Sequence, residues 1–371
     1  MIPATVPIQR PAEAKLLVAG KDGRIEHWRR RDFVRLFREG DLVIANDAAT
    51  LPASLQGQHV RSGREIEVRL AGRDSLDQVR RFSAVLFGRG DYRTRTEDRP
   101  VPPPVQPGDR LTLGPLQARI VGLHHHPRLV ALEFEGSSDR IWEGLARHGQ
   151  PIQYSHMSAP LAVWDTWTPI AGPPVAFEPP SSGFVLDWAA LASLTKRGVR
   201  FATITHAAGI SSTGDPMLDA RLPFDEPYRI PASTAEAIRQ ARELDTRVIA
   251  IGTTVVRALE HAATIGPVVQ AGEAVASHRI DASSRLRVVN AILSGTHEPG
   301  TSHYDMLRAF VDDRTLNRIS RALDEHRYRT HEFGDSLFLE AARQLAGVSR
   351  APEGALSPAG SAPASTCSRV A

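Results

Sequence analysis

The sequence predicts an α/β protein in which a domain of parallel strands and helices is interrupted by an inserted β-barrel domain. Strand and helix patterns alternate after about residue 177, short β-type runs fill about residues 55 to 150, and the first 55 residues again have α/β character. We therefore expect a discontinuous α/β domain made of residues 1–57 and 152–348. Residues 58–151 are expected to form the barrel domain between its two parts.

The N-terminal half contains two strand patterns of the α/β part, at 15–18 and 41–45. The β-type runs that follow are separated by glycine and proline, and the proline-rich segment 100–108 is the strongest break. The expected strands of this region are 65–70, 81–87, 110–113, 119–123 and 129–134. Short strands separated by turn residues are typical of a small barrel or sandwich.

The C-terminal half begins with a helix expected over 187–197, where Asp187 is a suitable N-cap and Gly198 a suitable stop. Further expected elements are strands at 199–205, 247–251 and 287–293, and helices at 231–244, 252–263 and 304–311. Residues 349–371 are rich in Ala, Pro, Ser and Gly and poor in large apolar residues, so we expect a disordered tail.

The composition is that of an ordinary globular protein, with 42% hydrophobic and 23% charged residues. The 45 basic and 42 acidic residues leave a net charge of +3, which does not by itself predict a nucleic-acid partner. Cys367 is the single cysteine, which excludes intrachain disulfides and cysteine-based zinc sites. No stretch approaches the roughly 18–20 apolar residues of a membrane helix, and the N-terminus lacks a secretory pattern. We expect a cytoplasmic protein with no membrane partner, and a monomer rather than an oligomer.

The strongest local pattern is a buried strand that ends in Gly252-Thr253-Thr254 and turns into a helix. Free N–H groups and the positive dipole end of such a helix suit an anion such as a carboxylate or phosphate. Arg257 and Glu260 lie three residues apart on this helix. A plain helix start followed by a surface ion pair fits the pattern equally well. If the segment binds a ligand, Arg257→Ala should weaken binding or turnover and leave thermal stability nearly unchanged.

Three other polar segments could carry chemistry. His206 ends a strand before Gly209, which suits a general base or a substrate donor, and equally a hydrogen-bonded structural residue. Glu226 lies in a proline-bounded loop beside a second carboxylate, where a solvated surface residue is the default. His297 lies in a polar strand-to-helix turn, a common place for sites in parallel α/β folds.

Two further patterns favour structural interpretations. The three histidines at 124–126 lack a cysteine, acidic or histidine partner at fixed spacing, so we expect a loop and predict no metal site. Trp164 and Trp167, near Tyr154, could stack on a nucleobase, but we expect them to form core at the domain junction.

Several stretches match the motifs of one known family in order and spacing. The most specific is Arg247-Val-Ile-Ala-Ile-Gly-Thr-Thr-Val-Val-Arg-Ala-Leu-Glu260. Others are Gly40-Asp-Leu-Val-Ile-Ala-Asn46, Leu51-Pro-Ala-Ser-Leu-Gln-Gly57, Val288-Val-Asn-Ala-Ile-Leu293 and Phe333-Gly-Asp-Ser-Leu-Phe338. Over about residues 14–340 the chain thereby resembles the S-adenosylmethionine:tRNA ribosyltransferase-isomerase family of queuosine biosynthesis. That family has an α/β domain interrupted by a β-barrel domain.

The resemblance implies transfer and isomerisation of the ribosyl part of S-adenosylmethionine onto 7-aminomethyl-7-deazaguanine in a tRNA anticodon. The products would be epoxyqueuosine, adenine and methionine. The positive sulfonium acidifies the adjacent sugar carbon, so a base must remove that proton, adenine must leave and the amine must attack. The implied cosubstrate is S-adenosylmethionine, the implied partner is tRNA, and no metal is required. By the same resemblance, acid–base or orienting candidates are His206, Glu226 and His297, and substrate-binding candidates are Asn46, Ser182, Gly183, Gly209, Gly252, Thr253, Thr254, Arg257 and Glu260.

The sequence departs from the family pattern at several polar positions. The family's Pro-Thr-Ala-Gly-Leu-His-Phe is Pro180-Ser-Ser-Gly-Phe-Val-Leu186 here, so the histidine is missing, and its Met-His-Ser-Glu is Pro223-Phe-Asp-Glu226. Its Asn-Asn-Thr-Arg is Asn46-Asp-Ala-Ala49 here. Its His-Val-Gly-Ala-Gly-Thr-Phe is His206-Ala-Ala-Gly-Ile-Ser-Ser212. Its Asn-Phe-His-Leu-Pro-Glu-Ser-Thr is Gly295-Thr-His-Glu-Pro-Gly-Thr-Ser302. Two alternatives follow. One is a paralogue that uses S-adenosylmethionine on a small-molecule acceptor, and the other is a non-catalytic RNA-binding protein on the same fold.

Overall fold

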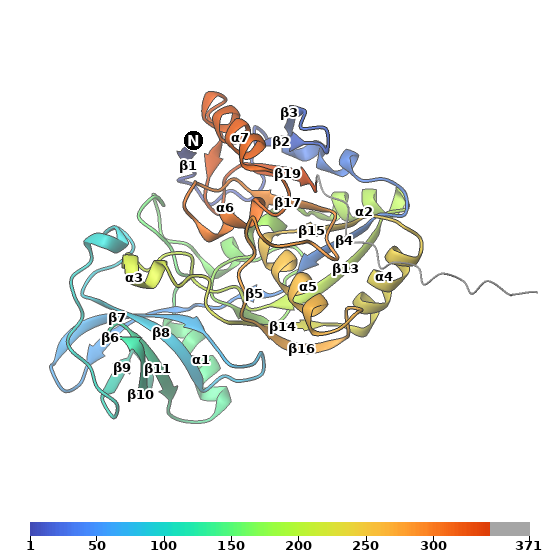
Figure 1. Cartoon of the computed structure of the whole chain (residues 1–371). Helices are drawn as coiled ribbons and strands as arrows, with labels where there is room; N and C mark the ends of the chain where they lie inside the picture. Colours follow the sequence, from blue (N-terminus) through green and yellow to red (C-terminus); the bar gives the residue numbers. More distant parts are fainter. Residues whose placement is uncertain (342–371) are drawn as a thin grey trace, which may run out of the picture.

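The computed structural model describes residues 1–341, which form a nine-stranded sheet with helices on both faces and a closed six-stranded barrel (Figure 1). The order of the sheet is β16-β14-β13-β4-β15-β17-β19-β2-β3. Its central strands β13 (Arg200–His206), β4 (Leu42–Asn46), β15 (Val248–Ile251) and β17 (Ala291–Gly295) are parallel. The expected α/β fold with an inserted barrel is confirmed. The expected disordered tail and Cys367 lie outside the described residues.

Strands of mixed direction extend the parallel centre on both sides. They are β14 (Glu226–Ile230) and β16 (Gly272–Ala276) on one side, and β19 (Ser336–Glu340), β2 (Lys15–Ala19) and β3 (Ile25–Arg29) on the other. The expectation of a loop around Glu226 is wrong, because this residue begins β14. Pro227 is accommodated at the second position of the strand, where its carbonyl accepts the N–H of Ala207 at 3.0 Å.

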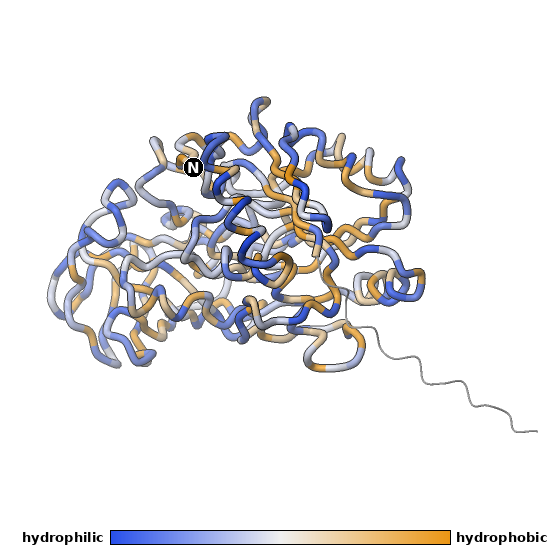
Figure 2. The backbone as a smooth tube through the Cα atoms, turned by 45° about the horizontal axis from the view of Figure 1, so that its top comes forward, coloured by the Kyte–Doolittle hydropathy of each residue, from blue (hydrophilic) through white to orange (hydrophobic). Residues whose placement is uncertain are grey.

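Alternate side chains of β4 pack against different helices, which makes the larger part a three-layer structure. Leu42 and Ile44 share a core with α4 (Ala232–Glu243), α5 (Thr253–Ile265), α6 (Ser302–Leu307) and α7 (Asp313–Glu325). Val43 and Ala45 share another core with η1 (Arg30–Leu36) and α2 (Trp188–Lys196). Burial on both faces explains why β15 and most of β4 are continuous apolar runs. In Figure 2, hydrophobic stretches run through the middle of the molecule, and hydrophilic stretches lie mostly on its outer parts.

The barrel closes in the order β10-β11-β8-β7-β6-β9. Its strands are β6 (Ser54–His59), β7 (Arg64–Gly72), β8 (Arg81–Gly88), β9 (Arg110–Leu113), β10 (Leu116–His126) and β11 (Leu129–Phe134), and α1 (Ser138–His148) packs on it. The barrel core continues into the α/β part through β5 (Ala49–Thr50) and β12 (Pro174–Ala176), which pair with each other. The domain boundaries at 57/58 and 151/152 remain predictions. Smaller elements are β1 (Ile2–Pro3), β18 (Arg329–Thr330), α3 (Pro216–Asp219), η2 (Thr96–Asp98), η3 (Val163–Thr166) and η4 (Ser181–Val185).

None of the helices within residues 1–341 combines the length and apolar character that crossing a membrane requires.

The strand expected at 287–293 begins only at Ala291, because the side chain of Glu260 binds the backbone N–H groups of residues 287–289. The carboxylate of Glu260 accepts the N–H groups of Arg287 at 2.7 Å, Val288 at 3.0 Å and Val289 at 2.9 Å. These amides are therefore unavailable for a strand ladder. Glu260 is a structural acceptor inside the fold, so the alternative interpretation of a surface ion pair with Arg257 is wrong.

We predict that Glu260→Ala lowers the free energy of unfolding by about 1–3 kcal/mol or more, because it leaves buried N–H groups without an acceptor. Urea unfolding followed by circular dichroism measures this loss. Glu325→Ala, at the exposed end of α7, is the matched control and should leave the stability nearly unchanged. Equal stability of the two variants would contradict the structural role of Glu260.

Candidate functional site

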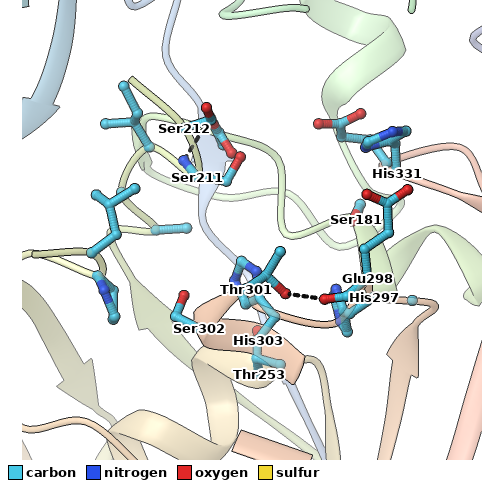
Figure 3. Close-up of a pocket in the computed structure, with 18 of the residues that line it drawn as sticks. Ser181, Ser211, Ser212, Thr253, His297, Glu298, Thr301, Ser302, His303 and His331 are labelled. Atoms are coloured by element: carbon cyan, nitrogen blue, oxygen red, sulfur yellow. Dashed lines mark hydrogen bonds between the residues drawn. The ribbon is translucent and has the colours of Figure 1, made fainter. Parts of the chain in front are cut away.

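A cavity of about 880 Å³ lies where loops at the carboxyl ends of the central parallel strands meet. Its wall contains residues that follow β13, β15 and β17, the segments 154–156 and 178–182, and residues 95–97 of the barrel part. Figure 3 shows Ser211, Thr253 and His297, which come from three of these loops, around one space. Ligands of open α/β folds bind at this edge of the sheet.

The start of α5 faces the cavity, as the Gly-Thr-Thr pattern predicts. Gly252 has a φ of 98°, a conformation that favours glycine, and no side chain caps the helix. A Cβ at this glycine would also lie 3.4 Å from the Cβ of Ser182, so the turn and η4 approach closely. Thr253 and Thr254 line the cavity beside the first helical N–H groups. This end of the helix can therefore receive an anionic group of a ligand.

Arg257 is buried below this turn, with 2% of its surface exposed. Its guanidinium forms an ion pair with Glu226 and donates to the carbonyls of Phe224 at 2.9 Å, Ala276 at 2.8 Å and His278 at 3.2 Å. One side chain thus ties α5 to β14, to β16 and to the segment after β16. The expectation that Arg257→Ala leaves stability nearly unchanged is therefore wrong on physical grounds, because the substitution would leave a buried carboxylate unpaired.

Glu226 connects this ion pair to the loop after β13. While one of its oxygens faces Arg257, the other accepts the N–H of Gly209 at 2.6 Å. A Cβ at position 209 would lie 2.8 Å from this oxygen, which is closer than real Cβ contacts come. Gly209 is required here because the carboxylate approaches its backbone. Glu226 and Gly209 both line the cavity, and their roles as acid–base and substrate-binding residues stay predictions.

His206 lies behind the cavity wall instead of in it. The side chain is fully buried, neither ring nitrogen has a hydrogen-bond partner within residues 1–341, and Nε2 lies 3.5 Å from Glu226. Burial, together with the charge of Arg257, lowers the pKa of His206 to about 3, so the ring is neutral near pH 7. Asn46 holds the same strand end: it accepts the His206 N–H and donates to the His206 carbonyl, each at 2.9 Å.

His297 does line the cavity. Its Nε2 lies 2.7 Å from the hydroxyl of Ser294, and its ring stacks on His303 at 4.9 Å between centroids. Burial, together with the nearby histidines, lowers the pKa of His297 well below the usual value. A neutral imidazole at this place can orient a polar ligand group without adding charge.

The structure brings most of the expected residues together and separates four of them. Those in the cavity wall are Ser182, Gly209, Glu226, Gly252, Thr253, Thr254, Arg257 and His297. Those outside it are Asn46, Gly183, His206 and Glu260. Within residues 1–341, no group of three or more His, Cys, Asp or Glu side chains is arranged so that it could hold a metal ion. The histidines at 124–126 therefore do not form such a group either.

Sequence reasoning missed a second group of side chains in the wall, namely Tyr154, His156, Glu178, His331 and Glu332. No local pattern marks these residues, because they come from three separate segments. In the sequence, Tyr154 stands out only as a neighbour of Trp164 and Trp167. These two tryptophans are 74% and 43% exposed, so the expectation that they form buried core is wrong.

The fold and the cavity define an α/β protein with a candidate ligand site at the carboxyl edge of its sheet. The model of the family described as queuosine biosynthesis protein matches residues 2–339, and the chain belongs to this family. The S-adenosylmethionine:tRNA ribosyltransferase-isomerase of Sorangium cellulosum is 31% identical, over 91% of this chain and 96% of that protein. The protein of the same name from Geobacter sulfurreducens is also 31% identical, over 90% and 94%. The solved S-adenosylmethionine tRNA ribosyltransferase of Thermotoga maritima is 23% identical, covering 91% of this chain and 96% of that one, with a TM-score of 0.48.

We predict that Arg257→Ala lowers the free energy of unfolding by about 3–5 kcal/mol, because it removes one partner of a buried ion pair. Arg239→Ala is the matched control, since Arg239 pairs with Glu236 and Glu243 on the exposed face of α4. Chemical denaturation compares the two variants. A loss no larger than that of the control would contradict the buried role of Arg257.

The lowered pKa of His206 predicts a pH dependence of stability. Because the folded state resists protonation, the unfolded state binds more protons between about pH 6.5 and pH 3, and stability falls as pH falls through this window. The slope from one such group is at most about 1.4 kcal/mol per pH unit. Urea unfolding at several pH values should show a shallower acid loss for His206→Gln than for the wild type. Parallel profiles would contradict the burial of a neutral imidazole.

Proposed function

We propose that this protein is an S-adenosylmethionine:tRNA ribosyltransferase-isomerase, which transfers and isomerises the ribosyl part of S-adenosylmethionine onto 7-aminomethyl-7-deazaguanine in a tRNA anticodon. Adenine and methionine leave, and the tRNA carries epoxyqueuosine. The observation that carries this proposal is the cavity at the carboxyl edge of the parallel strands, in a chain that matches its family from residue 2 to 339. The cosubstrate is S-adenosylmethionine, the partner is tRNA, and the place of action is the cytoplasm.

The cavity has the size and chemistry that this cosubstrate needs. Its volume falls within the range of roughly 300–1,000 Å³ usual for small-molecule sites. The start of α5, with Thr253 and Thr254, is positioned to take the α-carboxylate of the methionyl part. Glu332 lines the wall, and its contact with His156 helps to hold the pKa of its carboxyl group below the usual value against burial, so it provides a negative environment for the sulfonium and the α-ammonium group.

The reaction requires removal of a proton from the sugar carbon beside the sulfonium, departure of adenine, and attack by the aminomethyl group of the acceptor. Glu226 and His297 are in the wall and can orient these groups. His206 is outside it and, being neutral and buried, supports the strand end behind Glu226. The barrel residues 95–97 in the wall place the second architectural part next to the site.

We expect adenine release when the protein is mixed with S-adenosylmethionine and tRNA that carries 7-aminomethyl-7-deazaguanine, and no release when that tRNA is left out. Liquid chromatography of free adenine measures both arms. Release that is independent of tRNA would favour a small-molecule acceptor, and no release in either arm would contradict the proposed activity.

We also expect Thr253→Val to weaken S-adenosylmethionine binding by about 1.5–3 kcal/mol, since it removes a hydroxyl from the proposed carboxylate site. Thr264→Val, at the exposed end of the same helix, is the matched control. Calorimetric titration gives both affinities. Equal affinities of the two variants would contradict the proposal that the methionyl carboxylate binds at the start of α5.

A further inference from the structure

Glu178 is a carboxyl group in the cavity wall with an unusual set of partners. It lies two residues after the end of β12, is 8% exposed and lines the cavity. Its Oε1 accepts the hydroxyl of Tyr154 and the N–H of Ser211, the latter at 3.0 Å. Both partners are neutral, whereas Glu226 faces the guanidinium of Arg257. Both of these hydrogen bonds fall on Oε1, so Oε2 remains for contact with a ligand.

This environment suits a carboxyl group that exchanges a proton near neutrality. Burial, followed by the charge of Glu332, raises the pKa of Glu178 to about 7, although Tyr154 and Ser211 oppose the rise by donating to the carboxylate. Glu332 supplies that negative charge because its contact with His156, at 3.3 Å, helps to hold its pKa below the usual value against burial. A base works best when its pKa is close to the operating pH.

The charged and titratable groups around Glu178 come from several elements. Arg69 of β7 lies over the ring of Tyr154 at 5.4 Å, and the ring of His156 stacks against that of Tyr154 at 6.3 Å. His331 stacks on His156 at 4.0 Å, and burial, together with His156, lowers its pKa. The charged and titratable groups around the hydrogen-bonded pair of Glu178 and Tyr154 are thus one arginine, two histidines and the carboxylate of Glu332.

The other acid–base candidates are less suited to accept a proton from a ligand. The ring of His206 is outside the cavity, and both oxygens of Glu226 are engaged by Arg257 and Gly209. His297 is neutral, and its Nε2 is already in contact with Ser294. Glu178 combines access to the cavity, an oxygen left for a ligand and a pKa of about 7.

We propose that Glu178 is the catalytic base that takes the proton from the sugar carbon beside the sulfonium, with Tyr154 and Glu332 as positioning residues. This inference rests on the proposed function. In the step, the C–H bond breaks, its electron pair stays on the carbon next to the positive sulfur, and the proton moves to Oε2 of Glu178. The product pair is a sulfonium ylide and a neutral carboxylic acid. The hydrogen bonds from Tyr154 and Ser211 hold Oε1 and thereby orient Oε2.

The test is the pH profile of adenine release for the wild type, Glu178→Gln, Tyr154→Phe and Glu332→Gln. Glu178→Gln should lower kcat by about 10²–10⁴-fold and leave the affinity for S-adenosylmethionine nearly unchanged. Tyr154→Phe removes a donor to the carboxylate, which raises its pKa, so the acidic limb of the profile should move to higher pH. Glu332→Gln removes a like charge, so the same limb should move to lower pH. Glu143→Gln, on the exposed face of α1, is the matched control.

Opposite displacements by Tyr154→Phe and Glu332→Gln support the assignment even if Glu178→Gln does not fold. If the acidic limb moves in the same direction for Tyr154→Phe and Glu332→Gln, the assignment of Glu178 is overturned while the proposed function stands. An unchanged kcat of a folded Glu178→Gln overturns the assignment in the same way. A wild type that releases no adenine overturns the proposed function, and the assignment with it.

Discussion

The buried ion pair between Arg257 and Glu226 is the interaction on which the candidate site depends. Arg257 is anchored on α5, and Glu226 begins the strand β14 beside the parallel centre. The second oxygen of Glu226 fixes the loop after β13 through Gly209, so a single charge pair positions the helix start and two strand ends. Removing two charges from water is costly, and it is compensated here by hydrogen bonds to three backbone carbonyls and one backbone amide. The same network that keeps the sheet edge intact therefore shapes the cavity.

The wall of the cavity has a consistent electrostatic character. Burial lowers the pKa values of His297, His303 and His331, so these rings are neutral near pH 7, while the contact with His156 helps to hold the pKa of Glu332 below its usual value against burial. Such a wall attracts a cationic ligand, and the positive end of α5 provides one place for an anionic group within it. A zwitterionic sulfonium compound carries both kinds of group. The charge pattern thus agrees with the proposed cosubstrate at both ends of the molecule.

Local patterns in the sequence were sufficient for the fold and for the turn at Gly252. Continuous apolar strands, helix caps such as Asp187 and the Gly-Thr-Thr turn are determined by neighbours in the chain, and each lies where the pattern predicts it. The errors concern residues whose surroundings come from distant segments. Glu260 stops the expected strand at 287–293 because it binds amides 27 to 29 positions away. Tyr154 and Glu178 carry no local signature, since their proximity results from packing of separate loops.

The central claim is that the loops at the carboxyl ends of β13, β15 and β17 form one site for a sulfonium nucleoside. A crystal structure of the protein soaked with S-adenosylmethionine tests it most directly. We expect density in the cavity, with the methionyl carboxylate at Thr253 and Thr254 and the sugar near Glu178. Density bound elsewhere, or an empty cavity at a saturating concentration, would contradict the claim.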